Sequence, residues 1–228
     1  MAVYDLEEQE QLDELKTWWR VYGNLVTAIV VALALAVLAW QGWNWWQRQQ
    51  AAEASQLYMG VQRAAAQNDA KRARELAGEL IDKYSLTAYA SMAALLSGKA
   101  QAEAGDVKTA KAQLQWAAEN AKDPALRDLA RLRLAAVLLD EKAHDEALKQ
   151  VAGEPAAASF APRFGEMRGD ILAEQGKPAE ARAAYEAALA KLAANLGAGT
   201  TADVAANGPY KDVLQTKRDA LGTGGGAK

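Results

Sequence analysis

An uncharged, strongly apolar segment near the start of the chain limits most what this sequence can fold into. No Asp, Glu, Lys or Arg occurs from Val21 to Gln47, and residues 25–40 are almost wholly alanine, valine, leucine and isoleucine. A helix rises about 1.5 Å per residue, and a bilayer core is roughly 30 Å thick. The stretch from Val21 to Trp43 is therefore long enough for a membrane-spanning helix, which we predict here.

The tryptophans support this prediction by their position. Six of the seven lie at the two ends of the segment and none lies in its interior. Amphipathic rings are typical of the interface between membrane and water. A signal peptide would have a basic start and a small-residue cleavage site, whereas this chain starts acidic and its apolar run ends in tryptophans, so we expect an uncleaved anchor. The residues expected at the interface are Trp18, Trp19, Tyr22, Trp40, Trp43, Trp45 and Trp46.

Basic residues near the span do not decide its orientation. Basic residues near the ends of a span tend to stay in the cytoplasm. Lys16 and Arg20 precede this span, and Arg48 and Arg63 follow it, so the two sides have equal numbers and the rule favours neither orientation. The layout favours export of the long part, because an uncleaved N-terminal anchor usually exports the domain on its C-terminal side. The expected organisation is an acidic cytoplasmic tail at 1–20, an anchor at 21–46, an exported helical domain at 47–196, and a loop, short helix and flexible glycine-rich end at 197–228.

The composition after the anchor narrows the function classes. Basic and acidic side chains are equal in number from residue 51 onward, so neither nucleic acid nor an anionic surface is the expected partner. The chain has no cysteine, which excludes disulfides and cysteine-based metal sites. Alanine, leucine, glutamate, lysine, arginine and glutamine dominate, and these strong helix formers predict an all-α domain.

A pattern of spaced residues recurs four times in this helical part. Each unit has a turn residue, a small residue seven positions before it (Gly98, Ala135 and Gly169 in the last three units) and an alanine five positions after it. Further residues follow at four- and three-residue steps, such as Tyr185 and Ala188, so the small residues predict two closely packed antiparallel helices with an aromatic ring beside them. Two positions depart from the pattern: Val61 stands where a small residue is expected, and Glu154 stands where an alanine is expected. Because of Glu154, we expect the second helix of the third unit to stop near Val151. The turn residues are Asn68, Gly105, Lys142 and Gly176, and the alanines are Ala73, Ala110, Ala147 and Ala181, spaced 37, 37 and 34 residues apart.

This pattern resembles the tetratricopeptide repeat, a helix-turn-helix unit of 34 residues that stacks into a superhelix. The expected fold class is therefore all-α, with a single N-terminal transmembrane helix followed by a tetratricopeptide-repeat-like α-solenoid of about four repeats. A plain bundle of alanine-rich helices is the alternative.

Several segments in a fixed order resemble one bacterial family. They are the acidic tail with Glu10-Gln11, then "LKTWW", Gly23, the single span, "TAYASMAALLSGK", "RLRLAAVLL" and "GDILAEQGKPAEARAAYEAAL". Together they look like the YfgM family, an ancillary subunit of the Sec translocon with a periplasmic tetratricopeptide-like domain. The similarity covers nearly the whole chain, from about Glu8 to Leu196, although no single motif in it is catalytic or unique.

The resemblance implies a single-pass protein of the bacterial inner membrane, cytoplasmic at its N-terminus and periplasmic after about Trp46. The implied partners are the SecYEG translocon, the membrane-anchored periplasmic chaperone PpiD, and exported client proteins. Two other hypotheses stay open. One is a tetratricopeptide scaffold for another envelope complex, for cytochrome maturation or the cell wall, and the other is an inward-facing signalling adaptor with the opposite topology.

The sequence offers little for an enzyme. His144 is the only histidine, and we expect it to be a solvated turn residue. One histidine without cysteine supplies neither a zinc site nor a nucleophile pair. We therefore expect no catalytic activity, no cofactor, no metal and no small-molecule substrate.

The first helix of each tetratricopeptide repeat lines the concave side of the stack, and the repeat register assigns residues to that side. The third repeat contributes apolar residues, and its neighbours contribute charged ones. The leucines of the third repeat have two interpretations. They pack against the next repeat, or they form an apolar groove with a charged rim that binds a chaperone or an extended client segment. The candidate partner-binding residues are Lys99, Glu103, Leu129, Leu132, Ala136, Leu139, Arg163, Glu166, Asp170 and Glu174.

Overall fold

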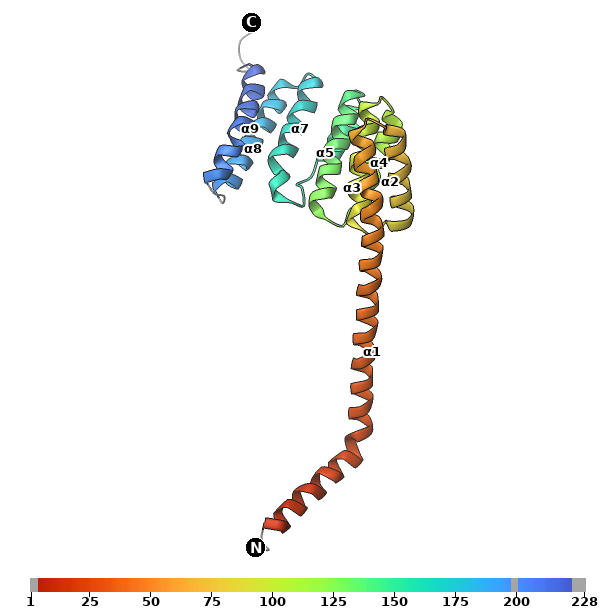
Figure 1. Cartoon of the computed structure of the whole chain (residues 1–228). Helices are drawn as coiled ribbons and strands as arrows, with labels where there is room; N and C mark the ends of the chain where they lie inside the picture. Colours follow the sequence, from red (N-terminus) through yellow and green to blue (C-terminus); the bar gives the residue numbers. More distant parts are fainter. Residues whose placement is uncertain (1–3, 198–200, 223–228) are drawn as a thin grey trace. The chain divides into compact units, whose positions relative to one another are not determined.

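The computed structural model describes the backbone of residues 4–197 and 201–222 and the side chains of residues 15–197 and 207–222. All regular structure in these ranges is helical (Figure 1), which confirms the all-α expectation. The chain packs into two compact units, Met1–Gln50 and Ala51–Lys228, and the boundary between them falls inside the first helix.

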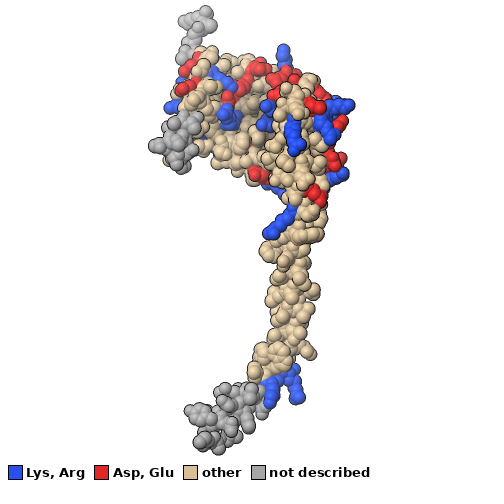
Figure 2. Space-filling model, viewed as in Figure 1, with Lys and Arg blue, Asp and Glu red and all other residues tan. Residues whose placement is uncertain are grey.

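Helix α1 (Tyr4–Ala66) contains the apolar segment. Its most apolar stretch has a mean hydropathy of 2.3, and the rest of the chain covers almost none of it. Among the described helices, only α1 is long and apolar enough to cross a membrane. Leu33, Leu35 and Leu38 are 61–65% exposed, and Figure 2 shows this stretch as a long uncharged surface. A core helix would bury such side chains, so the exposure fits a single membrane span.

The aromatic residues at the two ends of the span contact one another along the helix. The rings of Trp18 and Tyr22 lie 5.8 Å apart, and those of Trp43 and Trp46 lie 5.2 Å apart. All seven aromatic residues expected at the interface are exposed, and their place at a membrane rim stays a prediction. The side chains of the acidic residues before Leu15 lie outside the described residues.

The second unit is built from helices that pack in chain order. From α2 onward each helix contacts the next, and α5 also contacts α3 and α7. The last residues of α1 act as the first helix of the first repeat, because Ala54, Val61 and Ala64 share a core with residues of α2. The elements are α2 (Ala70–Tyr84), α3 (Ala88–Glu103), α4 (Val107–Asn120), α5 (Pro124–Asp140), α6 (His144–Val151), a 3-10 turn η1 (Ala158–Phe160), α7 (Ala161–Glu174), α8 (Pro178–Gly197) and α9 (Thr201–Ala220).

The turn inside each repeat has the same hydrogen-bonded geometry. Asn68, Gly105, Lys142 and Gly176 have positive φ angles of 57°, 82°, 60° and 73°. In each turn, the amide after that residue donates to a carbonyl five positions earlier, and the turn residue's own amide donates three positions back. This is the Schellman geometry of a helix end, in which one left-handed residue satisfies the last carbonyls. The four turns confirm the repeat register expected from the sequence.

Small residues allow the two helices of a repeat to approach closely. A Cβ atom on Gly98 would lie 2.8 Å from Cγ of Leu114, and one on Gly169 would lie 2.5 Å from Cε1 of Tyr185. Ala181 is fully buried on the facing helix. The aromatic ring therefore occupies the space that the glycine leaves, as the spacing predicts.

The third repeat has a short second helix, and α6 ends at Val151 as expected. Asp128 on α5 is fully buried, and its Oδ2 accepts a hydrogen bond from the amide of Ala157 at 2.8 Å. Asp128 was not singled out from the sequence, since a buried aspartate cannot be told from the solvated ones of an alanine-rich helix.

The C-terminal part differs from the expected loop. Helix α9 begins at Thr201 and continues through Pro209, so the stretch to Gly208 is helical from Thr201 onward. The Gly208-Pro209 pair indicates a break, but the alanines before it favour helix. Residues 198–200 and the glycine-rich end at 223–228 lie outside the described residues.

Candidate functional site

The candidate residues occur on the first helices of the second, third and fourth repeats. Lys99 and Glu103 are on α3, and their side chains form an exposed ion pair at 3.5 Å. Such a solvated pair contributes at most about 1 kcal/mol, so both groups are available to a partner at little cost.

The apolar members of the set are on α5 and are half-buried. Leu129, Leu132 and Leu139 pack against the core formed by buried residues of α3 to α7, and Ala136 is also partly covered. They are therefore neither enclosed like Leu134 nor fully open. A half-buried side chain contributes to the core and still presents apolar surface. These leucines therefore fit both packing against the next repeat and an apolar groove for a partner.

Arg133 lies beside these leucines, and it was not predicted from the sequence. Its Nη1 donates to the carbonyl of Leu95 on α3 at 3.1 Å. Burial lowers the pKa of its guanidinium, while the charge of Glu103 opposes that shift. A positive group thus sits between α3 and α5 within the candidate surface, and only its neighbourhood in the repeat register could have indicated it.

The charged members on α7 contact other helices of the chain. Glu166 and Asp170 hold the ammonium of Lys217 from α9, with Nζ at 2.9 Å from Oε1 of Glu166. The guanidinium of Arg163 lies 3.7 Å from the ring centre of Tyr210, also on α9. The sequence did not indicate α9 as a neighbour of these residues, because the repeat register ended at the fourth repeat.

The environment of this cluster shifts several titrating groups. Burial opposes the charge on Lys217, but the hydrogen bonds that its ammonium donates to Asp170 and Glu166 outweigh this and raise its pKa above the ordinary value. Burial, followed by the hydrogen bond to Asp170, raises the pKa of the Tyr185 hydroxyl. Lys217 is therefore charged and Tyr185 neutral at physiological pH, so Tyr185 can donate and the carboxylate accept.

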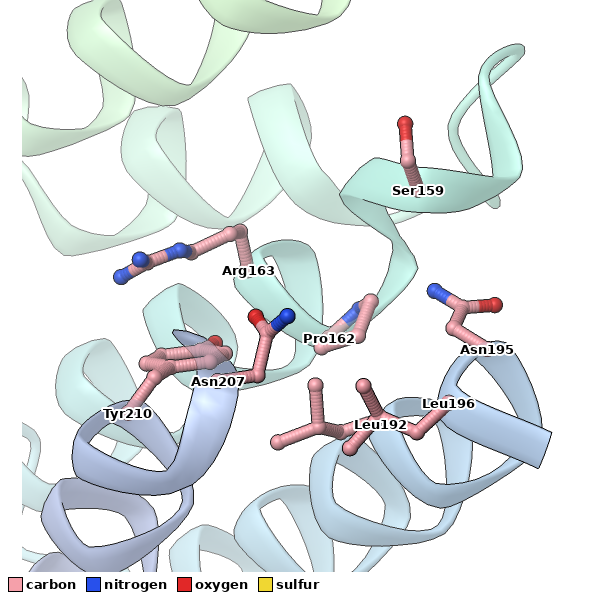
Figure 3. A pocket seen from close by; sticks show the side chains of 8 residues that line it. All are labelled: Ser159, Pro162, Arg163, Leu192, Asn195, Leu196, Asn207 and Tyr210. Atoms are coloured by element: carbon pink, nitrogen blue, oxygen red, sulfur yellow. The ribbon is translucent and has the colours of Figure 1, made fainter. Parts of the chain in front are cut away.

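A small cavity of about 250 Å³ lies between the start of α7, the end of α8 and α9. Leu192 and Leu196 line it from α8, and Arg163 and Tyr210 lie together at one end (Figure 3). The remaining lining residues are Ser159, Pro162, Asn195 and Asn207. The lining pairs apolar carbons with amides and one guanidinium, a combination that is typical of ligand-binding pockets.

His144 is the first residue of α6, and its side chain contacts Glu174, the candidate residue at the end of α7. Its Nε2 lies 3.4 Å from Oε2 of Glu174, in an exposed contact between neighbouring repeats. The described residues contain no group of three or more histidine or carboxylate side chains that could hold a metal ion. This single contact supplies neither a metal centre nor a paired nucleophile.

Comparison with known proteins gives one consistent result. The chain matches the family described as a tetratricopeptide repeat-like domain over residues 16–223. It is 32% identical over 189 residues to a Neisseria gonorrhoeae protein named "Ancillary SecYEG translocon subunit", covering 82% of this chain and 90% of that protein. Proteins of the same name from Haemophilus influenzae (32%, 81% and 90% covered) and Escherichia coli K12 (29%, 83% and 90% covered) also match. No solved structure gives a significant match.

Proposed function

This chain belongs to the YfgM family of ancillary SecYEG translocon subunits, and we propose that it is a non-enzymatic, membrane-anchored accessory subunit of the Sec translocon. The observation that carries the proposal is the extent of the likeness: about nine-tenths of each relative is covered. The family model, which matches residues 16–223, includes both the apolar helix and the repeat domain.

The proposed topology places the N-terminal tail in the cytoplasm and the repeat domain in the periplasm. Its support is the order of the parts, with one uncovered apolar helix before a large domain. Alkaline phosphatase fused after Lys228 should be active, and a fluorescent reporter that folds only in the cytoplasm should be dark. The opposite pair of results would favour the inward-facing adaptor.

The anchor should also remain uncleaved. Mass spectrometry of the protein extracted from membranes should find the acidic tail at its N-terminus. A mature chain that begins after Trp46 would contradict the proposed anchor, because the apolar segment would then be a signal peptide.

The proposed task of the repeat domain is to hand newly exported chains onward together with the membrane-anchored chaperone PpiD. The half-buried leucines of α5 support a shallow apolar groove, with the ion pair of Lys99 and Glu103 on the neighbouring helix α3 and Arg133 bridging α5 to α3. Binding in such a groove gains roughly 25 cal/mol per Å² of apolar surface removed from water. Shape should therefore matter more than charge for capture at this part of the surface.

Crosslinked pull-down from membranes in mild detergent tests the association. The full chain should recover SecY and PpiD, and Leu132→Glu should lose PpiD while far-UV circular dichroism retains the helical signal. Leu86→Glu is the matched control, because Leu86 is exposed in the turn between α2 and α3. Failure to recover SecY would contradict the proposed function, and unfolding by Leu132→Glu would show that this leucine is core rather than groove.

A further inference from the structure

Helix α9 takes the place of the first helix of a fifth repeat. It packs against α8 as each earlier first helix packs against the helix before it. Its side chains meet α7 in register, with Tyr210 over Arg163 and Lys217 on Asp170, each pair 47 residues apart. Helix α9 ends at Ala220, and no further helix follows it among the described residues.

Lys217 occupies a site built for an ammonium group. Its Nζ lies 2.8 and 2.7 Å from the two carboxylate oxygens of Asp170 and 2.9 Å from Oε1 of Glu166. The hydroxyl of Tyr185 donates to Oδ1 of Asp170 at 2.7 Å and holds that carboxylate in place. Both acidic side chains are largely shielded from solvent, at 13% and 25% exposure, which strengthens charge-assisted hydrogen bonds.

Among the side chains that the structure describes, α9 buries fewer than α8, and Tyr210 and Leu221 are only partly buried against the same core. Leu214 is its only fully buried side chain among the described residues, whereas α8 buries five side chains. Val213 is exposed, and the end of the helix is held by a hydrogen bond from Arg182 to the carbonyl of Gly222 at 2.7 Å. Elements with few buried apolar contacts open at low free energy, and their ionic contacts weaken with salt.

We propose that α9 is a displaceable latch: Lys217 fills an ammonium site made by Glu166 and Asp170, and a lysine-bearing segment of a protein partner takes that site when α9 leaves. With Lys217 in place the two carboxylates are largely neutralised. With α9 displaced both lose the ammonium, and Glu166 keeps only its 3.4 Å ion pair with Arg163 of the same helix. The chemistry of the site selects a cationic segment, since only hydrogen-bond donors with positive charge satisfy both acids. Which protein carries that segment depends on the proposed function, but the displacement of α9 does not.

Hydrogen exchange of the full chain in detergent micelles tests the latch without any partner. Lys217→Met should raise exchange in peptides from residues 207–222 on the order of tenfold and leave α3 and α4 unchanged. Lys211→Met is the matched control, because Lys211 is exposed on the same helix and its loss gives the same net charge. Raising NaCl from about 50 mM to about 500 mM should produce a smaller rise in the same peptides of the unmodified chain, because salt screens a partly buried ion pair less than an exposed one. Unchanged exchange of α9 in both measurements would overturn the latch.

A lysine oligomer tests the site itself. Fluorescently labelled hexalysine should bind the Lys217→Met chain at least about tenfold more tightly than the Lys211→Met chain, and Glu166→Gln with Asp170→Asn should remove the difference. Equal affinity for the two lysine variants would overturn the ammonium site. Recovery of SecY is a separate readout: its failure with a working latch rejects the proposed function alone.

Discussion

The third repeat (α5 and α6) and the fourth (α7 and α8) form the same helical hairpin by different means. The fourth has a glycine against an aromatic ring, Gly169 on Tyr185, and a second helix of 20 residues. The third has Ala135 at the glycine position and a second helix of only 8 residues. Close packing of small residues therefore supports the long hairpin of the fourth repeat, whereas the shortened hairpin of the third needs polar contacts at its open end.

Those polar contacts gather around the end of α6. Arg131 donates from Nε to the carbonyl of Gln150 at 2.8 Å, and Arg168 donates to the carbonyl of Val151 at 2.6 Å. Asp128 accepts from the amide of Ala157 and lies 3.6 Å from the guanidinium of Arg131. Carbonyls that a longer helix would satisfy internally are satisfied here by arginines of the two flanking first helices.

The largest expected effect comes from removing the buried acid of the third repeat. Asp128→Ala should lower the free energy of unfolding by about 3–5 kcal/mol, because it leaves Arg131 without its buried partner and the amide of Ala157 unpaired. Thermal unfolding of the full chain in micelles, followed by circular dichroism, measures the change. Asp140→Ala in the same helix is the exposed control, and an equal loss for both would show that the polar cluster does not hold this repeat.

The next effect concerns small-residue packing in the fourth repeat. Ala181→Leu should lower the free energy of unfolding by about 1–3 kcal/mol, because the fully buried Ala181 leaves no room for a larger side chain. Ala183→Leu, on the exposed side of the same helix, should change it little. The midpoint of thermal unfolding compares the two, and an unchanged midpoint for Ala181→Leu would contradict the repeat register.

Local features of the two repeats could be predicted from the sequence, and contacts between distant residues could not. The turns and the small-residue contacts were predictable, because Gly105, Gly176 and Ala181 are constrained by local backbone geometry and by a fixed spacing. Asp128 and Lys217 were not, because their roles depend on contacts 29 and 47 residues away, with Ala157 and Asp170. The candidate surface shows the same division: its helices were predicted correctly, but the contacts of α7 with α9 were not.

The turns provide a smaller test of the same contrast. Gly176→Ala in the fourth repeat should lower the free energy of unfolding by about 1–2 kcal/mol, because an L-residue is strained at a positive φ. Gly153→Ala is the control, since Gly153 has ordinary backbone and open space around its Cα. Chemical denaturation of the full chain in micelles compares them, and a stabilising Gly176→Ala would mean that this turn is not held in the left-handed region.

The smallest effect should have the opposite sign. Lys142 holds the left-handed position of the third repeat, with φ of 60°, and its side chain is exposed. Glycine adopts this conformation without strain but loses more entropy on folding, so Lys142→Gly should raise the free energy of unfolding by only about 0.5–1 kcal/mol. Lys149→Gly, inside α6, should lower it by about 1 kcal/mol, because glycine is a poor helix former. If both variants lost stability, the third repeat would depend on the side chain of Lys142. The left-handed backbone at Lys142 would then not be a source of strain that the fourth repeat avoids with Gly176.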